Sequence, residues 1–488
     1  MPETENELFA LNFIRIITVL TGIVGASFIV PVSFGIFYGE TRSVVSFLVP
    51  MAVSLIALAA VNVPLRRQKI TLNIRQTFAV VAGAWVFTSV FGALPLWLSG
   101  AFPSFTDALF ESVSGFTTTG ATVSGNVEIL PVSVNVWRCQ THWLGGMGIV
   151  TLTVALLPLL GVGGFQLIKA ETTGPEKGKV TARIATTAKI LWIIYSVMTA
   201  VQTVLLMLAG MNFSDALAHS FATLGTGGFS TRNASVGSYN STAADVICAV
   251  FMFLSGINFS LFYYIIVRKF SEVRMNSELK AYAGIIVASS VATAACLVKF
   301  YGGFLNALRF SFFQVVTIIT TTGFSTADYT AWPSSAQFWI FLMFFIGGCS
   351  GSTAGGIKVV RWVVLFKQIG CETKRMLHPH GIFSIRLNGR PGSKDTVFTV
   401  AAFMVVYFVL VMITSFAGCA AGLDMFTAFT ASLSMVGNVG PAFGDLGPAF
   451  NWGFLPSALK WWYCFAMLAG RLELYTMIIF FLPSYWRK

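Results

Sequence analysis

The sequence predicts an all-α integral membrane protein in which one helical unit occurs four times, after two additional N-terminal transmembrane helices. Three observations lead to this fold class: an apolar composition, about ten apolar stretches of membrane-spanning length, and a short glycine motif that recurs between them. Of the 488 residues, 56% are hydrophobic and only 10% are charged, against about a quarter in a soluble domain. Because so few polar side chains cannot cover a water-exposed surface, we expect lipid to surround the chain.

The apolar stretches are the first element of this prediction. A membrane span needs about 20 mostly apolar residues. The stretches that meet this criterion are 10–37, 44–64, 76–100, 137–164, 187–210, 244–267, 281–301, 336–366, 396–421 and 458–483. The first begins with acidic residues and is too long for the apolar region of a signal peptide, so we expect a retained helix.

The basic residues indicate how these spans are oriented. The net charge is +12, and 23 of the 31 Lys and Arg fall in alternate loops or at the C-terminus. These clusters lie at 66–75, 169–189, 268–280, 358–394 and 487–488. Loops rich in Lys and Arg stay in the cytoplasm, so we expect both termini there. Topology thus explains the charge, and we expect no nucleic acid as a partner.

The internal repeat is a short polar segment that lies between two spans in each unit. The four segments read F-T-T-T-G-A-T (116–122), L-G-T-G-G-F-S (224–230), I-T-T-T-G-F-S (319–325) and V-G-N-V-G-P-A (436–442). They align on Gly120, Gly228, Gly323 and Gly440. A mildly apolar stretch of about three helical turns precedes each one. Asp107 and Asp215 stand 13 residues before the glycine in the first two units, where Asp is typical of a helix start.

This unit is typical of a cation filter. In lipid, irregular backbone is tolerated only where it is buried in protein or lines a water-filled cavity. Rings of backbone carbonyl oxygens can replace the water shell of an alkali cation, and glycine permits the backbone angles that aim them. We therefore expect four pseudo-repeats of helix, pore half-helix, filter strand and helix around a central pore. The acidic residues of the outer segments are expected to divide between helix capping and concentrating cations at the mouth.

The motifs resemble the Trk/Ktr/HKT superfamily of potassium transport proteins, and most closely its bacterial TrkH/TrkG branch. The similarity is carried by S-G-F-T-T-T-G-A-T (114–122), W-R-C-Q-T-H-W-L-G-G-M-G-I (137–149) and the three other filter segments. The two N-terminal helices also resemble the Trk branch. The resemblance places the K⁺ filter at Thr118, Thr119, Gly120, Ala121, Thr226, Gly227, Gly228, Phe229, Thr321, Thr322, Gly323, Phe324, Asn438, Val439, Gly440 and Pro441. Glycine at all four aligned positions accompanies potassium selectivity in this superfamily, whereas Asn438 departs from the Thr-x-Gly pattern.

A glycine-rich run interrupts the span 336–366. Five glycines in the ten residues 347–356 make a poor helix, since each costs about 1 kcal/mol relative to Ala. A close helix-packing patch is the alternative. The resemblance implies an intramembrane loop that obstructs the pore below the filter. The gate residues that follow are Gly347, Gly348, Ser350, Gly351, Ser352, Thr353, Ala354, Gly355, Gly356, Lys358 and Arg471.

Two charged residues of these segments, Arg471 and Lys358, have two possible roles each, and Arg138 has one. Arg471, inside the last span, is either part of a buried structural ion pair or, as the resemblance implies, an electrostatic barrier below the filter. Lys358 either anchors the glycine loop or is a plain cytoplasmic-end lysine. For Arg138 we expect a structural partner such as Glu111.

The segment boundaries follow from the repeat. We expect an N-terminal two-helix extension at 1–70, pore repeat one at 71–168, pore repeat two at 169–272, pore repeat three with the loop 347–356 at 273–368, and a cytoplasmic connector with pore repeat four at 369–488.

The predicted function is potassium uptake across the bacterial cytoplasmic (inner) membrane through a gated, channel-like filter. A sodium-permeable or an H⁺- or Na⁺-coupled symporter is the alternative, although the central spans carry few of the acidic residues or histidines such relays use. We expect no enzyme, because no nucleophile elbow, phosphate loop or metal set is present. K⁺ is expected as the transported ion, with no covalently bound cofactor. The resemblance implies a homodimer and a cytosolic TrkA-type nucleotide-binding regulatory subunit.

Overall fold

The computed structural model describes residues 5–486 apart from 66–67, 69–71, 149–183 and 392–393. Within these ranges the chain is helical except for loops and one short antiparallel pair, β1 (Arg386–Leu387) with β2 (Arg390–Pro391). The prediction of an all-helical protein is therefore confirmed, with this hairpin as a minor addition.

The helices follow one another from the N-terminal extension to the C-terminus. The first are α1 (Glu5–Ser27), α2 (Ile29–Phe37), α3 (Thr41–Asn62), α4 (Ile74–Leu98), α5 (Phe105–Phe116) and α6 (Val132–Gly146). Next come α9 (Ile184–Leu208), α10 (Phe213–Leu224), η2 (Ser235–Tyr239), α11 (Thr242–Ser255), α12 (Phe259–Ile266) and α13 (Phe270–Met275). They continue with α14 (Ser277–Tyr301), α15 (Phe304–Ile319), η3 (Tyr329–Ala331), α16 (Ser334–Met343) and α17 (Val359–Leu377). The last are α18 (Lys394–Ala420), α19 (Met425–Gly437), η4 (Gly444–Leu446), α20 (Ser457–Arg471), α21 (Tyr475–Ile478), η5 (Ile479–Phe481) and α22 (Pro483–Trp486).

Six described helices are long and apolar enough to cross a membrane, or up to eight if each of two bent pairs counts as one span. The bent pairs are α11 with α12, at 91°, and α20 with α21 and η5, at 119°. The predicted spans 244–267 and 458–483 are therefore each broken by a bend. The span 336–366 is interrupted as expected, between α16 and α17. The second half of the predicted span 137–164 and most of the basic cluster 169–189 lie outside the described residues.

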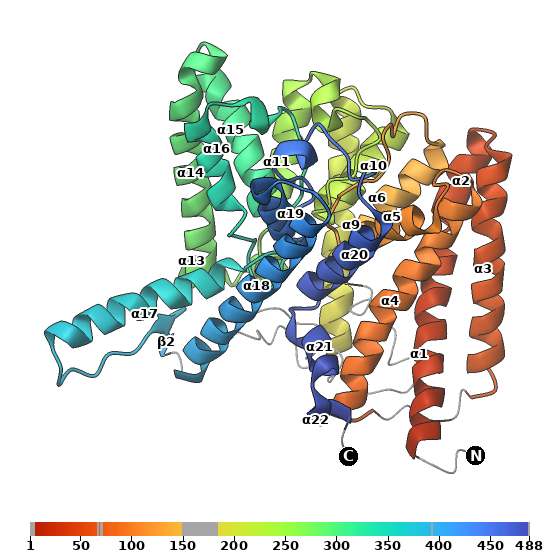
Figure 1. Ribbon diagram of the computed structural model, residues 1–488, viewed down its shortest axis with the longest axis horizontal. Helices are drawn as coiled ribbons and strands as arrows, with labels where there is room; N and C mark the ends of the chain where they lie inside the picture. The colour runs from red at the N-terminus through yellow and green to blue at the C-terminus, as the bar shows by residue number, and fades with distance from the viewer. Residues whose placement is uncertain (1–4, 66–67, 69–71, 149–183, 392–393, 487–488) are drawn as a thin grey trace.

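The four short helices α5, α10, α15 and α19 each pack against the long helix that precedes them. Three of them also contact a helix of a neighbouring unit, namely the one that follows that unit's own short helix. The pairs are α6 with α10, α11 with α15 and α20 with α5. These contacts form three of the four junctions in a circle of segments, while α1, α2 and α3 stand at one side of the bundle (Figure 1).

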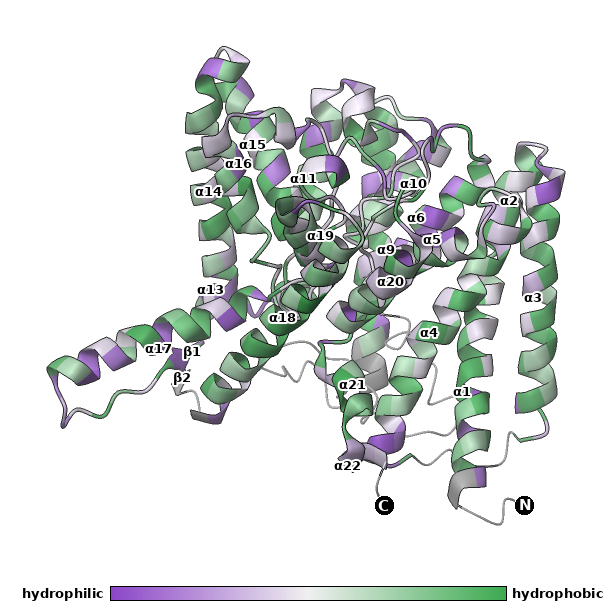
Figure 2. Cartoon of the chain, viewed as in Figure 1, coloured by the Kyte–Doolittle hydropathy of each residue, from purple (hydrophilic) through white to green (hydrophobic). Residues whose placement is uncertain are grey.

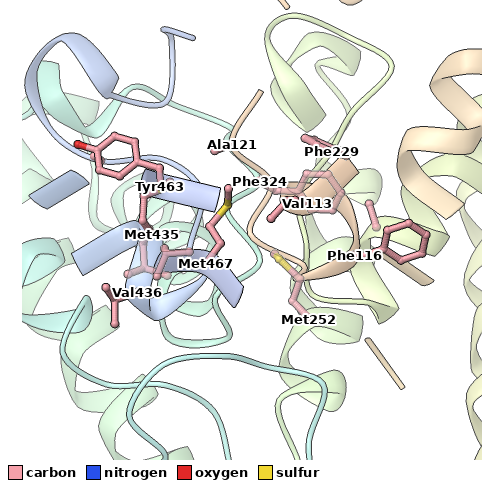
Figure 3. Packing of buried hydrophobic residues seen from close by; sticks show 14 of the residues in the cluster. Val113, Phe116, Ala121, Phe229, Met252, Phe324, Met435, Val436, Tyr463 and Met467 are labelled. Atoms are coloured by element: carbon pink, nitrogen blue, oxygen red, sulfur yellow. The ribbon is translucent and has the colours of Figure 1, made fainter. Parts of the chain in front are cut away.

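Apolar side chains fill the space around the centre of this circle (Figure 3). Phe116, Phe229 and Phe324 come from segments about a hundred residues apart, yet they belong to one buried cluster. Apolar residues also cover the outward surfaces of the long helices (Figure 2), as lipid contact requires. The polar strands at the centre are thus enclosed by protein rather than by lipid.

Helix α17 leaves the bundle and projects to one side (Figure 1). Phe366, Ile369 and Met376 are exposed along it, and Lys374 and Arg375 stand in its last turn. The projecting part of α17 therefore presents both apolar and basic side chains that the rest of the described chain leaves uncovered.

Candidate functional site

The four predicted filter strands, called the strands below, each follow directly after one of the four short helices. They are 118–121, 226–229, 321–324 and 438–441. Three of these helices begin at an N-cap whose side-chain oxygen accepts a backbone N–H, and the caps are Ser104, Asn212 and Asp424. All three stand 16 residues before the aligned glycine of their unit. Asp107 and Asp215 lie in the first turn instead, so their interpretation as helix starts was wrong by three residues. The C-terminal ends of the helices, where carbonyl groups lack helical partners, therefore adjoin the strands.

The four strands share one unusual backbone pattern. The aligned residue and the one two positions earlier both have positive φ in every strand: Thr118 (58°) and Gly120 (82°), Thr226 (54°) and Gly228 (76°), Thr321 (52°) and Gly323 (79°), Asn438 (56°) and Gly440 (102°). Positive φ is uncommon for a non-glycine residue and strained for a β-branched one such as Thr. Alternation of left- and right-handed residues can turn successive carbonyl oxygens toward the same side of a strand. Because the same alternation occurs in all four strands, all four meet the same requirement on the orientation of their carbonyl oxygens.

The four aligned glycines form a closed ring. A side-chain carbon added to Gly120 would collide with the carbonyl oxygen of Gly227, and one added to Gly228 would collide with that of Thr322. The same relation joins Gly323 to Val439 O, and Gly440 to Thr119 O. The strands therefore meet in chain order around one axis, with the fourth next to the first. Only glycine fits at these positions, because the neighbouring backbone occupies the place of a Cβ and φ is positive.

A cavity of about 130 Å³ opens on one side of the ring, and all four aligned glycines line it. Other lining residues include Thr122, Ser124 and Arg232. None of the lining residues is acidic. The outer acids instead hold structure: Asp424 caps α19, Asp107 pairs with Lys460 at 2.7 Å, and others pair with arginine.

Asp215 is an example of an outer acid used in this way. Its carboxylate accepts hydrogen bonds from Thr231 at 2.7 Å, Tyr239 at 2.7 Å and Arg232 at 3.1 Å. Burial raises the pKa of Asp215, but these hydrogen bonds and the nearby positive charges outweigh it and leave the pKa below its ordinary value. The carboxylate therefore remains ionised and ties α10 to the segment that follows its strand.

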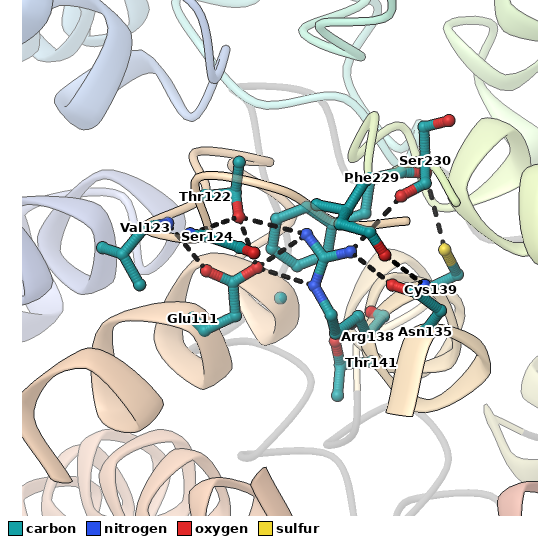
Figure 4. A network of polar contacts seen from close by, with 12 residues as sticks. Glu111, Thr122, Val123, Ser124, Asn135, Arg138, Cys139, Thr141, Phe229 and Ser230 are labelled. Atoms are coloured by element: carbon teal, nitrogen blue, oxygen red, sulfur yellow. Dashed lines mark hydrogen bonds and ion pairs between the residues drawn. The ribbon is translucent and has the colours of Figure 1, made fainter. Parts of the chain in front are cut away.

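An ion pair between Glu111 and Arg138 supports the first strand from behind (Figure 4). Both side chains are 1% exposed, and Arg138 Nη2 lies 2.7 Å from Glu111 Oε1. The same carboxylate accepts from the Thr122 hydroxyl at 2.8 Å and the Val123 amide at 3.0 Å. The guanidinium also lies 4.3 Å from the centre of the Phe229 ring, on the second strand. The expected partnership of Arg138 with Glu111 is confirmed, and it joins two adjacent strands.

His142 braces the second strand, and the sequence analysis did not single it out. It is fully buried; its Nδ1 lies 2.8 Å from Gly115 O, and Phe229 N donates to its Nε2 at 3.2 Å. The accepting Nε2 and the carbonyl partner of Nδ1 together define the neutral tautomer with the proton on Nδ1. The imidazole fills the space beside Gly227, where a side-chain carbon would collide with the ring. Only the fold reveals this role, since 87 residues separate His142 from Phe229.

The glycine-rich segment between α16 and α17 lies against the ring on the side away from the cavity. Gly355 N donates to the Thr321 hydroxyl at 2.7 Å, and Thr353 Oγ1 donates to Ser255 O at 3.2 Å. A side-chain carbon on Gly355 would lie 2.5 Å from Gly437 O, so the loop approaches the third and fourth strands closely. The loop therefore sits directly beneath the residues two positions before the aligned glycines.

Arg471 joins this loop to the first strand. Its guanidinium donates to Thr353 O at 2.9 Å, to Gly145 O at 2.7 Å, to Gly146 O at 3.0 Å and to the Thr118 hydroxyl at 3.3 Å. It stands at the end of α20, where the span bends, rather than in the middle of a continuous helix.

Lys358 and Glu473 complete the charges near Arg471. Lys358 is 3% exposed and its ammonium donates to Ala354 O, so it holds the loop rather than pointing into the cytoplasm. Glu473 forms an ion pair with Arg361 at 2.9 Å, so its negative charge in this apolar segment has a partner.

Glu278 is a further anchor of the loop that the sequence analysis missed. It lies in the first turn of α14, is 7% exposed, and accepts from Ser350 N at 2.7 Å and Val360 N at 3.1 Å. One carboxylate oxygen thus joins the glycine-rich segment, at Ser350, to the start of α17, at Val360. The only sequence signal for this role was an acidic residue at the start of an apolar span. A favourable interaction with the helix dipole explains such a residue equally well, so the signal does not identify an anchor.

The bends in the two broken spans also face the loop. Between α11 and α12, Gly256 O accepts from Cys349 N at 2.9 Å, and Phe259 N donates to Gly351 O at 3.0 Å. After α20, Glu473 and Leu474 adopt positive φ of 56° and 57°. Both breaks therefore depend on long-range contacts that local helix propensity does not report. Among the described residues no cluster of three His, Cys, Asp or Glu side chains could hold a metal ion.

Fold and site together define a multi-pass membrane protein with four glycine strands gathered at one axis and a loop beneath them. The family model of TrkH, described as a cation transport protein, matches residues 46–288 and 305–488. The chain therefore belongs to the TrkH cation transport protein family.

Individual relatives are similar over nearly the whole chain. The Trk system potassium uptake protein TrkH of Halomonas elongata is 40% identical over 451 residues, which cover 91% of this chain and 92% of the relative. TrkG of Escherichia coli K12 is 34% identical over 489 residues, covering 98% and 99%. The crystal structure of the potassium transporter TrkH from Vibrio parahaemolyticus matches with a TM-score of 0.86 at 34% identity, covering 98% and 99%.

Proposed function

We propose that this protein takes up potassium across the cytoplasmic membrane through a gated, channel-like filter of backbone carbonyl oxygens. The observation that carries the proposal is the ring of Gly120, Gly228, Gly323 and Gly440, with the same pair of left-handed residues in each strand. The names of the similar relatives, which are potassium uptake proteins, support potassium as the transported ion rather than as a bound cofactor.

Within this proposal the four segments act as pseudo-equivalent pore repeats. Each would contribute one strand of carbonyl oxygens that replace the hydration shell of K⁺. The C-terminal ends of α5, α10, α15 and α19 adjoin these strands, and their negative partial charge favours a cation. Because no carboxylate of the described residues lines the cavity beside the ring, the carbonyl groups rather than a ring of carboxylates would provide the attraction.

The glycine loop and Arg471 act as the gate in the conformation described. The loop lies beneath the Thr321 position, and the guanidinium stands 3.3 Å from the Thr118 hydroxyl. A positive charge at the inner end of the filter repels a cation that leaves the ring. Opening would require the loop and Arg471 to move away from the axis together, since Thr353 O joins them.

The proposed setting is the bacterial inner membrane, with both termini in the cytoplasm. The start of α1 and α22 lie at the same end of the bundle (Figure 1), which supports both termini on one side of the membrane. The exposed apolar and basic side chains of α17 suit a homodimer contact and a cytosolic nucleotide-binding regulatory subunit of the TrkA type.

Ion flux through the purified protein in liposomes tests the proposal. We expect uptake of radioactive rubidium that unlabelled K⁺ suppresses and Na⁺ suppresses much less. Currents that follow the K⁺ gradient alone support a channel-like mechanism, whereas uptake that requires an H⁺ or Na⁺ gradient identifies the coupled symporter instead. Equal competition by Na⁺ and K⁺ contradicts potassium selectivity.

A filter variant and a matched control connect the flux to the ring. Gly120→Ser should reduce the preference for K⁺ over Na⁺, because its added Cβ collides with the second strand. Gly125→Ala is the control: Gly125 lines the same cavity, and an added Cβ there meets only Asn451 Nδ2, at 4.0 Å. If both variants keep wild-type selectivity, the ring does not select the ion.

A further inference from the structure

Asn438 differs from its counterparts in what its side chain does. Thr118 and Thr321 accept hydrogen bonds from Arg471 and the glycine loop, and the Thr226 hydroxyl donates to Gly225 O, next to it in the chain. The Asn438 amide instead donates to Thr119 Oγ1 at 2.9 Å, across to the first strand. Of these four described residues, Asn438 is the one whose side chain hydrogen-bonds to a neighbouring strand.

The orientation of the Asn438 amide is fixed by a second contact. Its Nδ2 also lies 3.0 Å from Met467 O on α20. A backbone carbonyl can only accept, so the atom that faces it must be the nitrogen. Both protons of the amide are therefore used, one on the first strand and one on α20.

The bond to Thr119 continues into the first short helix. Thr117 Oγ1 donates to Val113 O at 2.7 Å, so its oxygen must accept the proton of the Thr119 hydroxyl, 2.8 Å away. The directed chain runs from Asn438 through two hydroxyl groups to a helix carbonyl. All of these side chains are buried, where hydrogen bonds are electrostatically stronger than in water.

The third strand provides a natural comparison. Thr322 and Thr320 repeat the hydroxyl pair at 2.8 Å, and Thr320 donates to Val316 O at 2.7 Å. The counterpart of Asn438 is different, however. Gly228 approaches Thr322 O as Gly440 approaches Thr119 O, so the matching residue is Thr226 on the second strand, and its hydroxyl donates to Gly225 O instead of to Thr322. The hydroxyl relay is thus present twice, and the side-chain link from Asn438 reaches only the first copy.

We propose that Asn438 is a positioning residue that sets the spacing between the fourth and first strands at the inner end of the ring, and with it the discrimination between K⁺ and Na⁺. This inference rests on the proposed filter. The spacing matters because the ring would bind the larger ion only if its oxygens stay far enough apart. The contact of Asn438 with α20, which ends at Arg471, also fixes the fourth strand relative to the proposed gate.

The test compares two threonine-to-valine variants of equal volume in the full-length protein. Thr119→Val removes the acceptor of the Asn438 bond, and Thr322→Val removes the matching hydroxyl of the third strand. The permeability ratio of K⁺ to Na⁺, from reversal potentials in planar bilayers, should fall about fivefold in Thr119→Val, the effect of losing one hydrogen bond. Thr322→Val removes a filter hydroxyl without removing a side-chain bond between strands, so the ratio should fall clearly less there than in Thr119→Val.

Asn438→Leu completes the cycle, alone and with Thr119→Val. If both groups act through one bond, the double variant should be no less selective than Asn438→Leu alone. Additive losses, or equal effects of the two valine variants, overturn the inference. If Asn438→Leu does not fold, the comparison of the valine variants still decides.

Failure of the proposed function gives a different result from failure of this inference. Wild-type protein without a K⁺ preference contradicts the filter itself. A selective wild type whose Thr119→Val variant keeps the same permeability ratio contradicts only the role of Asn438.

Discussion

Removal of the Arg471 charge should raise ion flux strongly, and the size of the effect can be worked from the structure. The guanidinium Nη1 lies 3.3 Å from the Thr118 hydroxyl. A cation bound at that hydroxyl would therefore stand within about 6 Å of the charge. At an effective dielectric constant of about 20, two unit charges at this separation repel by about 3 kcal/mol. This corresponds to roughly a hundredfold in ion occupancy.

Arg471→Ala should raise ion flux by less than this hundredfold change in occupancy, because the loop still lies beneath the ring. We expect at least a tenfold rise in rubidium flux per molecule in liposomes, normalised to the protein inserted. Arg471→Lys is the matched variant, since it keeps the charge and loses the forked contacts with Gly145 and Gly146. It should stay near wild-type flux if charge is the barrier.

Two results would refute this reasoning. Unchanged flux in well-folded Arg471→Ala would mean that the charge does not limit passage. Equal increases in the Ala and Lys variants would assign the barrier to the loop contacts instead of the charge.

Three further outcomes follow from the contacts described. Deletion of 350–354 should raise ion flux, because it removes half of the glycine-rich segment 347–356, including the Thr353 and Ala354 carbonyls that bind Arg471 and Lys358; unchanged flux at normal expression argues against a gate. Arg138→Met should lower the free energy of unfolding by about 3–5 kcal/mol, since it leaves buried Glu111 without its partner, and adding Glu111→Gln should recover part of the thermal stability. The lowered pKa of Asp215 stabilises the fold above the ordinary value of 3.8, and this contribution disappears as pH falls through the folded-state pKa. Asp215→Asn should therefore melt below wild type at pH 7, with a gap that narrows in acid; a gap independent of pH would contradict this.

The sequence alone was enough to predict which residues meet at the axis. Gly120, Gly228, Gly323 and Gly440 could be aligned because each lies in an irregular segment that lipid would not tolerate. The glycine density of 347–356 likewise predicted the interruption between α16 and α17. These are local signals of composition and spacing, and the backbone follows them directly.

The rest depends on contacts between distant parts of the chain. The bend after Arg471 occurs among leucines that favour a helix, so no local pattern predicts it. The partners of His142 and Glu278 lie 87 and 72 residues away, so the neighbouring sequence does not reveal them. The side chain of Asn438 was visible as a departure from Thr, but its target on the first strand was not.

Because one polypeptide provides all four strands of the ring, a single mutation changes one strand and leaves the other three unchanged. A tetramer of identical subunits would alter all four sides at once, so small steps in ion preference would be hard to reach. Here each junction can change separately, because each already uses a different side chain: His142 contacts Phe229, Asn438 contacts Thr119, and the Tyr329 hydroxyl donates to Ala442 O. Graded mixtures of monovalent-ion preference should therefore be accessible to relatives of this chain through substitutions made one side at a time.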